Sequence, residues 1–405
     1  MEENTLKINM RHVNNVKYLS IYLLTICSFI IPFYLCDTNR HNLKFCLPQI
    51  PLVVFLLYEL KKKDTKRSRV LGVLVLCYFL IFGYYNFNYL HCTWAWIYKT
   101  LSFVFLWQVT GYQNNTYKNK KFIESIGESI VWIFTGVVII SLLFALIGGD
   151  SIFLDLQDFH IRRRGIGLIF SDSRLTWVFM HKSSYGLLLA LMFCLVMKKK
   201  HIKHRKFILA TYFVTAILVN SMVSIASIVI IIIAFYLDTK QISRKVMIRI
   251  GIAFFFGLLV SVLGYFYISF NRDLSSLGDR AYIWAIYGSN LSRYPNGMGK
   301  RFFSDTFWIS TSGTTGRSIN NFHNVFLNEI IHYSVPVGVI FTILIIYIPI
   351  KSIKNNKSKL KNIIITTGLM LPIIFDQAIN CLLYTSTTVI CIVLCAGAGI
   401  HRLKH

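Results

Sequence analysis

Apolar runs of about twenty residues recur along this 405-residue chain and are separated by short basic segments. A helix needs roughly 20 apolar residues to cross the hydrocarbon core of a membrane. The pattern therefore predicts an all-α, polytopic membrane protein, with residues 1–405 forming a single transmembrane domain of about twelve helices. The predicted spans are residues 18–36, 43–60, 70–87, 93–112, 125–147, 174–197, 206–220, 221–238, 247–269, 325–350, 362–379 and 384–401.

Residues 206–238 form one apolar run that is too long for a single helix, so we divide it at Asn220-Ser221 into two spans joined by a tight outer turn. The positions of lysine and arginine support this division. With both termini in the cytoplasm, most of the 43 Lys and Arg residues fall in inner segments, as the positive-inside rule requires. Merging the two spans would move the basic segment at 240–249 to the outer side and break the pattern.

Composition agrees with this interpretation. Charged residues make up 15% of the chain, whereas a soluble protein has about 25%. The net charge of +26 would suit nucleic-acid binding, but in a membrane protein the positive-inside rule and anionic lipid headgroups explain it. We therefore predict a lipid environment and no nucleic-acid partner. The nine cysteines are scattered without the spacing of a metal site, and we predict no metal and no cofactor.

Two polar segments predicted on the outer side carry unusual basic charge: residues 148–173, and residues 271–324 between the ninth and tenth spans. Outer loops normally avoid Lys and Arg. Arginine binds phosphate through two parallel hydrogen bonds and keeps its charge, so these loops predict an anionic substrate at the outer face. The alternative is that long loops cross the membrane whatever their charge. The basic residues in or beside the loops are Arg162, Arg163, Arg164, Arg174, Arg272, Arg280, Arg293, Lys300, Arg301 and Arg317.

Motifs of several common enzyme classes are missing from the sequence. It contains no GxxxxGK[ST], GxGxxG, HExxH or Ser-centred nucleophile motif, which argues against an ATP-driven pump and the common hydrolases. Asp150, Asp155 and Asp158 lie in the first outer loop, but they do not form the DxD pair of a metal–diphosphate site.

His323 follows the polar end of the second loop and precedes an apolar helix predicted from Val325, which places it at or just beneath the outer interface. A histidine there could take a proton from an attacking hydroxyl group or bind a phosphate oxygen. The alternative is that it only anchors the end of the helix.

Ionisable side chains inside predicted spans are functional candidates, because a charge in the hydrocarbon region is costly. Glu329 and Asp376 could act as the base or could orient His323. Lys182 could contact an anionic substrate, or it could extend its ammonium group to the interface. The same alternative applies to Lys99, for which the sequence indicates no role.

Three segments of the second loop together resemble the signature of the Wzy-type O-antigen polymerase and O-antigen ligase superfamily. In that family an outer loop carries a Gly-x-Arg…Trp stretch, a Pro-x-Gly-x-Gly turn, and a His-Asn pair that opens the next helix. The matching residues here are Gly278-Asp279-Arg280 with Trp284, Pro295-Asn296-Gly297-Met298-Gly299, and His323-Asn324-Val325-Phe326-Leu327. The resemblance extends over roughly residues 160–350 and includes Phe179-Met180-His181-Lys182 with Gly186.

The chain also departs from the family pattern. A glycine is usual about ten residues beyond the His-Asn pair, with a second glycine three residues later. Here those positions are Ser334 and Val337, with Pro336 between them and Gly338 one place late. The departure concerns the packing of the tenth span rather than the site.

The resemblance implies a multi-pass protein of a bacterial cell membrane that polymerises oligosaccharide repeat units linked to undecaprenyl diphosphate, without a nucleotide and with inversion at the sugar carbon. A flippase and a chain-length regulator are the partners that the family implies. Catalysis would involve His323 and Arg280, with Asp376 or Glu329. The diphosphate would be bound by Arg280 and Arg174, then Arg164 or Arg301, with Lys182 and Asn324 nearby.

Two alternatives share the lipid-linked substrate. A ligase would transfer finished polysaccharide to another acceptor, and the sequence does not separate it from a polymerase. A flippase would place its cations inside a central cavity and would show short loops and internal halves, whereas the largest polar element here is one outer loop.

Overall fold

The structure is a computed structural model, and it describes a little over half of the chain. The described residues are 68–112, 117–147, 149–154, 159–163, 182–199, 202–219, 221–239, 291–299, 307–311, 314–319, 324–354 and 359–375, with the single positions 19, 23, 53, 54, 175, 177 and 322. The spans predicted at 18–36, 43–60, 247–269 and 384–401 lie outside the described residues, apart from isolated positions.

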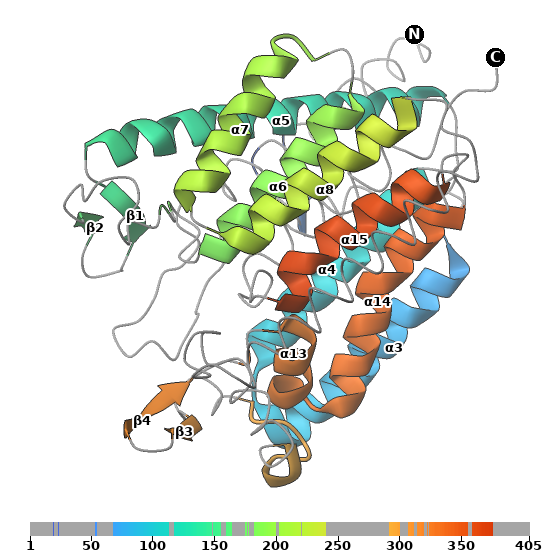
Figure 1. Cartoon of the computed structure of the whole chain (residues 1–405). Coiled ribbons are helices and arrows are strands. Elements are labelled where there is room, and N and C mark those ends of the chain that lie inside the picture. Colours follow the sequence, from blue (N-terminus) through green and yellow to red (C-terminus); the bar gives the residue numbers. More distant parts are fainter. Residues whose placement is uncertain are drawn as a thin grey trace, which may run out of the picture.

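The described part consists mainly of packed helices (Figure 1). The helices are α3 (Arg69–Tyr85), α4 (Thr93–Tyr112), α5 (Tyr117–Leu146), α6 (Lys182–Lys198), α7 (Arg205–Val219), α8 (Met222–Thr239), α13 (Val325–Tyr333), α14 (Val335–Lys354) and α15 (Lys359–Phe375). A short π-helical segment, η1 (Asn86–Leu90), continues α3. Two antiparallel hairpins pair β1 (Gly149–Leu154) with β2 (Phe159–Arg163), and β3 (Phe307–Thr311) with β4 (Thr314–Ile319).

Several of the predicted spans coincide with helices. The spans at 70–87, 93–112 and 125–147 correspond to α3, α4 and α5, and the start of the span at 362–379 to α15. The division at Asn220-Ser221 is confirmed, because α7 ends before it and α8 begins after it. The sixth span begins later than predicted: Trp177 has a φ of 50° and lies outside the helix, and α6 starts only at Lys182.

Two described helical segments, Arg69–Leu90 and Gly127–Leu146, are long and apolar enough to cross a membrane. On α3, the buried face is formed by Leu71, Val75, Tyr78 and Phe82. The opposite face is also apolar, and its exposed residues are Val70, Val73, Leu76 and Leu80. A helix that is hydrophobic all round suits an environment of lipid or protein better than water, which supports a membrane protein.

Helix α6 forms the centre of one half of the bundle, where all residues from Tyr185 to Val196 are buried. It packs against α7, α8 and α15. Buried hydroxyl groups link α5 to two neighbours: Ser141 bonds Tyr185 of α6 over 2.6 Å, and Thr135 bonds Tyr212 of α7 over 2.7 Å. These bonds satisfy polar groups that would otherwise be costly to bury.

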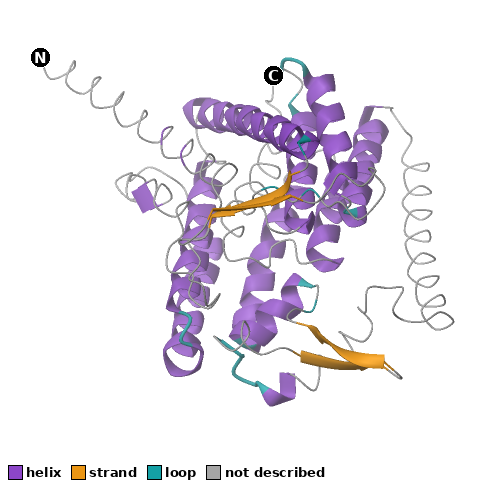
Figure 2. Cartoon of the chain, turned by 90° about the vertical axis from the view of Figure 1, so that its left-hand side faces the viewer, coloured by secondary structure: helices purple, strands orange, loops and turns teal. Residues whose placement is uncertain are grey.

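Both hairpins lie in the segments predicted as outer loops, and strands were not predicted there. They are on the left of Figure 1 and therefore on the side that faces the viewer in Figure 2. Arg162 and Arg163 belong to β2, and Arg317 to β4. The described hairpins of the two basic segments thus lie on one side of the helical bundle.

The single span predicted at 325–350 is wrong, because the chain forms two helices there. The break is at Ser334, whose φ of 93° and ψ of 159° lie in a region that is essentially restricted to glycine. Helix α13 then folds back along the first turns of α14. Gly338 makes this close approach possible, since a Cβ atom at that position would lie 2.7 Å from the Cα of Ile330. The hydropathy of this segment did not indicate the reversal.

Replacing Ser334 by glycine is expected to stabilise the protein by about 1–2 kcal/mol, because relief of roughly 1–3 kcal/mol of backbone strain exceeds the added entropy of a glycine. The substitution also removes a buried hydroxyl for which the described residues offer no hydrogen-bond partner. Thermal unfolding in detergent measures the change. Ser224→Gly is the matched control and should destabilise, because Ser224 lies within α8 and bonds Ser221 over 2.8 Å. An unchanged midpoint for Ser334→Gly would contradict the strain at Ser334.

Candidate functional site

The Pro-x-Gly-x-Gly turn at residues 295–299 caps the end of α13. The last carbonyl groups of a helix have no partners inside the helix. Here the Met298 N–H donates to the Ile331 carbonyl and the Gly299 N–H to the His332 carbonyl, each over 2.9 Å. The turn therefore substitutes for the helical hydrogen bonds that are lost where the chain reverses at Ser334.

Both glycines of the turn are required by geometry. Gly297 and Gly299 have φ values of 89° and 55°, which residues with a side chain rarely adopt. A Cβ atom at Gly297 would lie 2.7 Å from the Ser334 nitrogen, and one at Gly299 would lie 2.7 Å from the Cα of Leu90. The turn thus lies in close contact with both the C-terminal end of α13 and the connection from α3 to α4.

Two asparagines hold the backbone at the other end of α13. Asn324 is the N-cap, and its Oδ1 accepts hydrogen bonds from the N–H groups of Phe326 (2.9 Å) and Leu327 (3.1 Å). The Asn328 Oδ1 accepts from the Phe322 N–H over 2.8 Å. The residues on both sides of position 323 are therefore fixed to α13. Because the Asn324 oxygen serves the cap, the substrate contact predicted for Asn324 would have to use its Nδ2.

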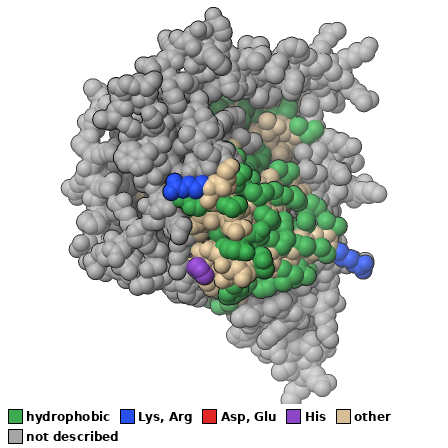
Figure 3. Space-filling view, turned by 90° about the horizontal axis from the view of Figure 1, so that it is seen from below, with side chains coloured by type: hydrophobic (Ala, Val, Ile, Leu, Met, Phe, Trp, Pro, Cys, Tyr) green, Lys and Arg blue, Asp and Glu red, His purple; other side chains and the backbone are tan. Residues whose placement is uncertain are grey.

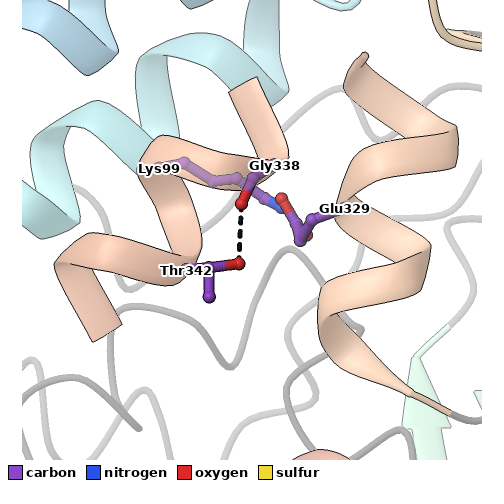
Figure 4. Close-up of polar contacts among 4 residues, drawn as sticks. All are labelled: Lys99, Glu329, Gly338 and Thr342. Atoms are coloured by element: carbon purple, nitrogen blue, oxygen red, sulfur yellow. Dashed lines mark hydrogen bonds and ion pairs between the residues drawn. The ribbon is translucent and has the colours of Figure 1, made fainter. Parts of the chain in front are cut away.

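A buried ion pair joins α4 to α13. The Lys99 Nζ contacts the Glu329 Oε1, and the two side chains are only 2% and 3% exposed (Figure 4). The Lys99 Nζ also lies 4.4 Å from the ring centroid of Tyr333 and 5.2 Å from that of Phe341, within the range of cation–π attraction. Lys99 therefore does not extend to an interface, and the sequence gave no sign of its partner.

Further polar side chains surround the pair. Tyr78 of α3 interacts electrostatically with Glu329, and His332 interacts electrostatically with Lys99. His332 stacks on Tyr333 with ring centroids 4.0 Å apart. Sequence reasoning missed His332, although Asn328, Glu329 and His332 recur at helical spacing on an otherwise apolar helix. That spacing was the available signal for a polar face on α13.

Of the remaining predicted site residues, the structure describes only Lys182. Lys182 is the first residue of α6 and is partly exposed. Helix α15 ends at Phe375, immediately before Asp376, and contacts α13. The other predicted residues lie outside the described part of the chain, and they are His323, Arg280, Asp376, Arg174, Arg164 and Arg301.

Two of the predicted residues therefore belong to α13, Asn324 as its N-cap and Glu329 near its middle, and Glu329 pairs with Lys99. Within the described residues, no group of three His, Cys, Asp or Glu side chains is arranged to hold a metal ion. Comparisons with protein-family models, curated proteins and solved structures find no match to this chain. The family resemblance accordingly rests on the motif residues of the sequence alone.

Proposed function

We propose that this protein is a membrane glycosyltransferase that polymerises oligosaccharide repeat units linked to undecaprenyl diphosphate at the outer face of a bacterial cell membrane. The observation that carries the proposal is that two of the motif segments lie at the two ends of one short helix, α13. The Pro-x-Gly-x-Gly turn caps one end of α13, and the His-Asn pair precedes the other end. Motif segments that are separated along the sequence thus hold the two ends of the same helix, which supports a shared role for them.

The proposed reaction is a displacement at a sugar carbon. A hydroxyl oxygen of one repeat unit attacks the sugar carbon that bears the diphosphate of a second lipid-linked chain. The new carbon–oxygen bond forms as the bond to the diphosphate breaks, and the lipid diphosphate leaves with the electron pair. His323 takes the proton from the hydroxyl group, with Asp376 or Glu329 as the alternative base. The glycosyl diphosphate bond supplies the energy, so no nucleotide takes part.

Arginines would stabilise the leaving group. The diphosphate carries several negative charges, and preorganised cations in a water-poor site lower the energy of the transition state. Arg280 and Arg174 are the first candidates for this role, followed by Arg164 and Arg301. The N-terminal end of α13 would also favour a negatively charged group, because the helix dipole places a partial positive charge beside Asn324.

The position of α13 supports a site that is partly covered by other helices, because α13 contacts α15. Helix α13 has nine residues, so Asn324 lies about 14 Å from the reversal at a rise of roughly 1.5 Å per residue. In Figure 1 the N-terminal end of α13 lies toward the C-terminal end of α15. A position there would shield the reacting groups from bulk water, which strengthens their electrostatic interactions.

The proposal requires a defined topology. Cysteine-accessibility labelling is expected to place residues 61–69, 198–206 and 351–361 in the cytoplasm, and residues 148–173 and 271–322 outside. The structure supports this grouping, since both hairpins lie on one side and Ser68 bonds Tyr347 over 3.2 Å near the predicted inner ends of α3 and α14. An inward-facing 271–322 segment would exclude the mechanism, because the substrate is presented at the outer leaflet.

Reconstitution tests the activity itself. Liposomes containing the purified protein and lipid-linked repeat units, with EDTA and without nucleotide, are expected to yield a ladder of polymer resolved by gel electrophoresis. Transfer of preformed polymer to another acceptor, without growth from single units, would favour the ligase. Movement of the lipid-linked unit across the bilayer without a new glycosidic bond would favour the flippase. Either result would replace the polymerase proposal.

A further inference from the structure

The ion pair between Lys99 and Glu329 has no role in the reaction proposed above unless Glu329 is the base. Taking two charges out of water is costly, and replacing a buried pair by apolar residues is often neutral or stabilising. The pair is therefore weak as a device for stability. A buried pair instead suits a role in fixing one arrangement of the two helices that carry it, α4 and α13.

The pair is well placed to fix α13. This helix has only nine residues, and its connection to α14 is the strained reversal at Ser334. The capping turn holds one end of α13 through the carbonyls of Ile331 and His332. Glu329 lies near the middle of the helix, so its contact with Lys99 restrains rotation of α13 about its axis (Figure 4).

Rotation of α13 would be transmitted directly to position 323. Asn328 is the neighbour of Glu329, and its Oδ1 holds the Phe322 N–H. Asn324 caps the same helix from the other side of position 323. The ion pair to Lys99 and the hydrogen bond to Phe322 are therefore made by adjacent residues of α13, and the backbone of this helix links them.

We propose that Lys99 is a positioning residue: by pairing with Glu329 it sets the rotation of α13 and so holds the backbone on both sides of His323. Lys99 acts through α13 and does not touch the substrate. The inference rests on the proposed function only for the consequence that His323 is catalytic. The mechanical part concerns the fold alone and can be measured without any substrate.

Hydrogen exchange measured by mass spectrometry tests the mechanical part in full-length protein in nanodiscs. In Lys99→Met and in Glu329→Gln, exchange of the Phe322, Phe326 and Leu327 amides should rise at least about fivefold, the change that corresponds to loss of one hydrogen bond. Asn328→Leu serves as the reference for direct loss of the acceptor at Phe322. Exchange in α7 and α8 should stay unchanged.

Two further variants separate positioning from general destabilisation. Tyr212→Phe removes the buried bond to Thr135 between α5 and α7 and should leave exchange at residues 322–327 unaltered. The charge-swapped double variant, Lys99→Glu with Glu329→Lys, should restore protection from hydrogen exchange at residues 322–327 if the ion pair is responsible. This variant also keeps the test decisive if either single variant fails to fold.

Turnover gives a second measurement. In reconstituted polymerisation, Lys99→Met should lower turnover by about a hundredfold, the cost expected for a small misplacement of a reacting group, with apparent donor affinity unchanged. Wild-type exchange at Phe322, Phe326 and Leu327 in folded Lys99→Met and Glu329→Gln would overturn the inference. If exchange rises but His323→Ala keeps full activity, the positioning of this backbone stands and the proposed role of His323 fails.

Discussion

Replacing His323 by alanine is expected to lower polymerisation turnover by about a hundred- to ten-thousandfold, the contribution typical of a general base. Donor binding should change little, because a base acts on the proton of the acceptor hydroxyl. His323→Gln keeps size and hydrogen bonding but cannot accept the proton, so it should be nearly as inactive. The measurement is reconstituted polymerisation from purified lipid-linked repeat units, with turnover and donor dependence determined for each variant.

The alternative role of His323 predicts a different pattern. If the side chain binds a phosphate oxygen, Gln should retain much of the activity, and the apparent donor affinity should fall in Ala. His91→Asn is a suitable control, since His91 is an exposed histidine with a φ of 53°, a conformation that asparagine tolerates. Near-normal rate and polymer length in His323→Gln would exclude the base role, and Asp376 or Glu329 would become the next candidate.

The helices were predictable where hydropathy and charge agree. The apolar runs located α3, α4 and α5, because a span has to be apolar over most of its length. The break between α7 and α8 followed from the length of the apolar run, which is too long for one helix, and the charge pattern supported it, because merging the two spans would move the basic segment at 240–249 to the outer side.

The reversal at Ser334 was not predictable from these signals. Residues 325–350 are mostly apolar, and hydropathy does not distinguish one long helix from a hairpin of two. The residue at the break is a serine, and a serine does not suggest a positive φ as a glycine would. The family resemblance held the clue, because glycine is usual at this position, and the structure shows a backbone conformation there that favours glycine.

The buried ion pair between Lys99 and Glu329 was predictable only in part. Glu329 stood out as a carboxylate inside a predicted span, and its partner is separated from it by 230 residues of sequence. Nothing in the local pattern around Lys99 indicates which helix α4 faces. The same holds for the Pro-x-Gly-x-Gly turn: its glycines suggested an unusual backbone, but the contact with Leu90 depends on tertiary packing.

Loss of Arg280 or Arg174 is expected to abolish polymer while leaving the protein level and the single lipid-linked units intact. Removing one preorganised donor to a developing negative charge costs on the order of a hundredfold or more in rate. Arg→Lys at either position should restore activity only in part, because lysine offers a point charge without the fork that binds two phosphate oxygens.

The second outer segment supplies a matched control. Arg293 lies in the same loop as Arg280, is exposed, and has its guanidinium 5.5 Å from the ring of Tyr294. Arg293→Ala removes one positive charge from the loop without touching the proposed diphosphate site, and it should retain most of the turnover because an exposed charge contributes little. Equal losses in Arg293→Ala and Arg280→Ala would indicate a general attraction of the anionic donor to the loop. Full activity in Arg280→Ala would remove that residue from the diphosphate site and leave Arg174, Arg164 and Arg301 as the cations to test.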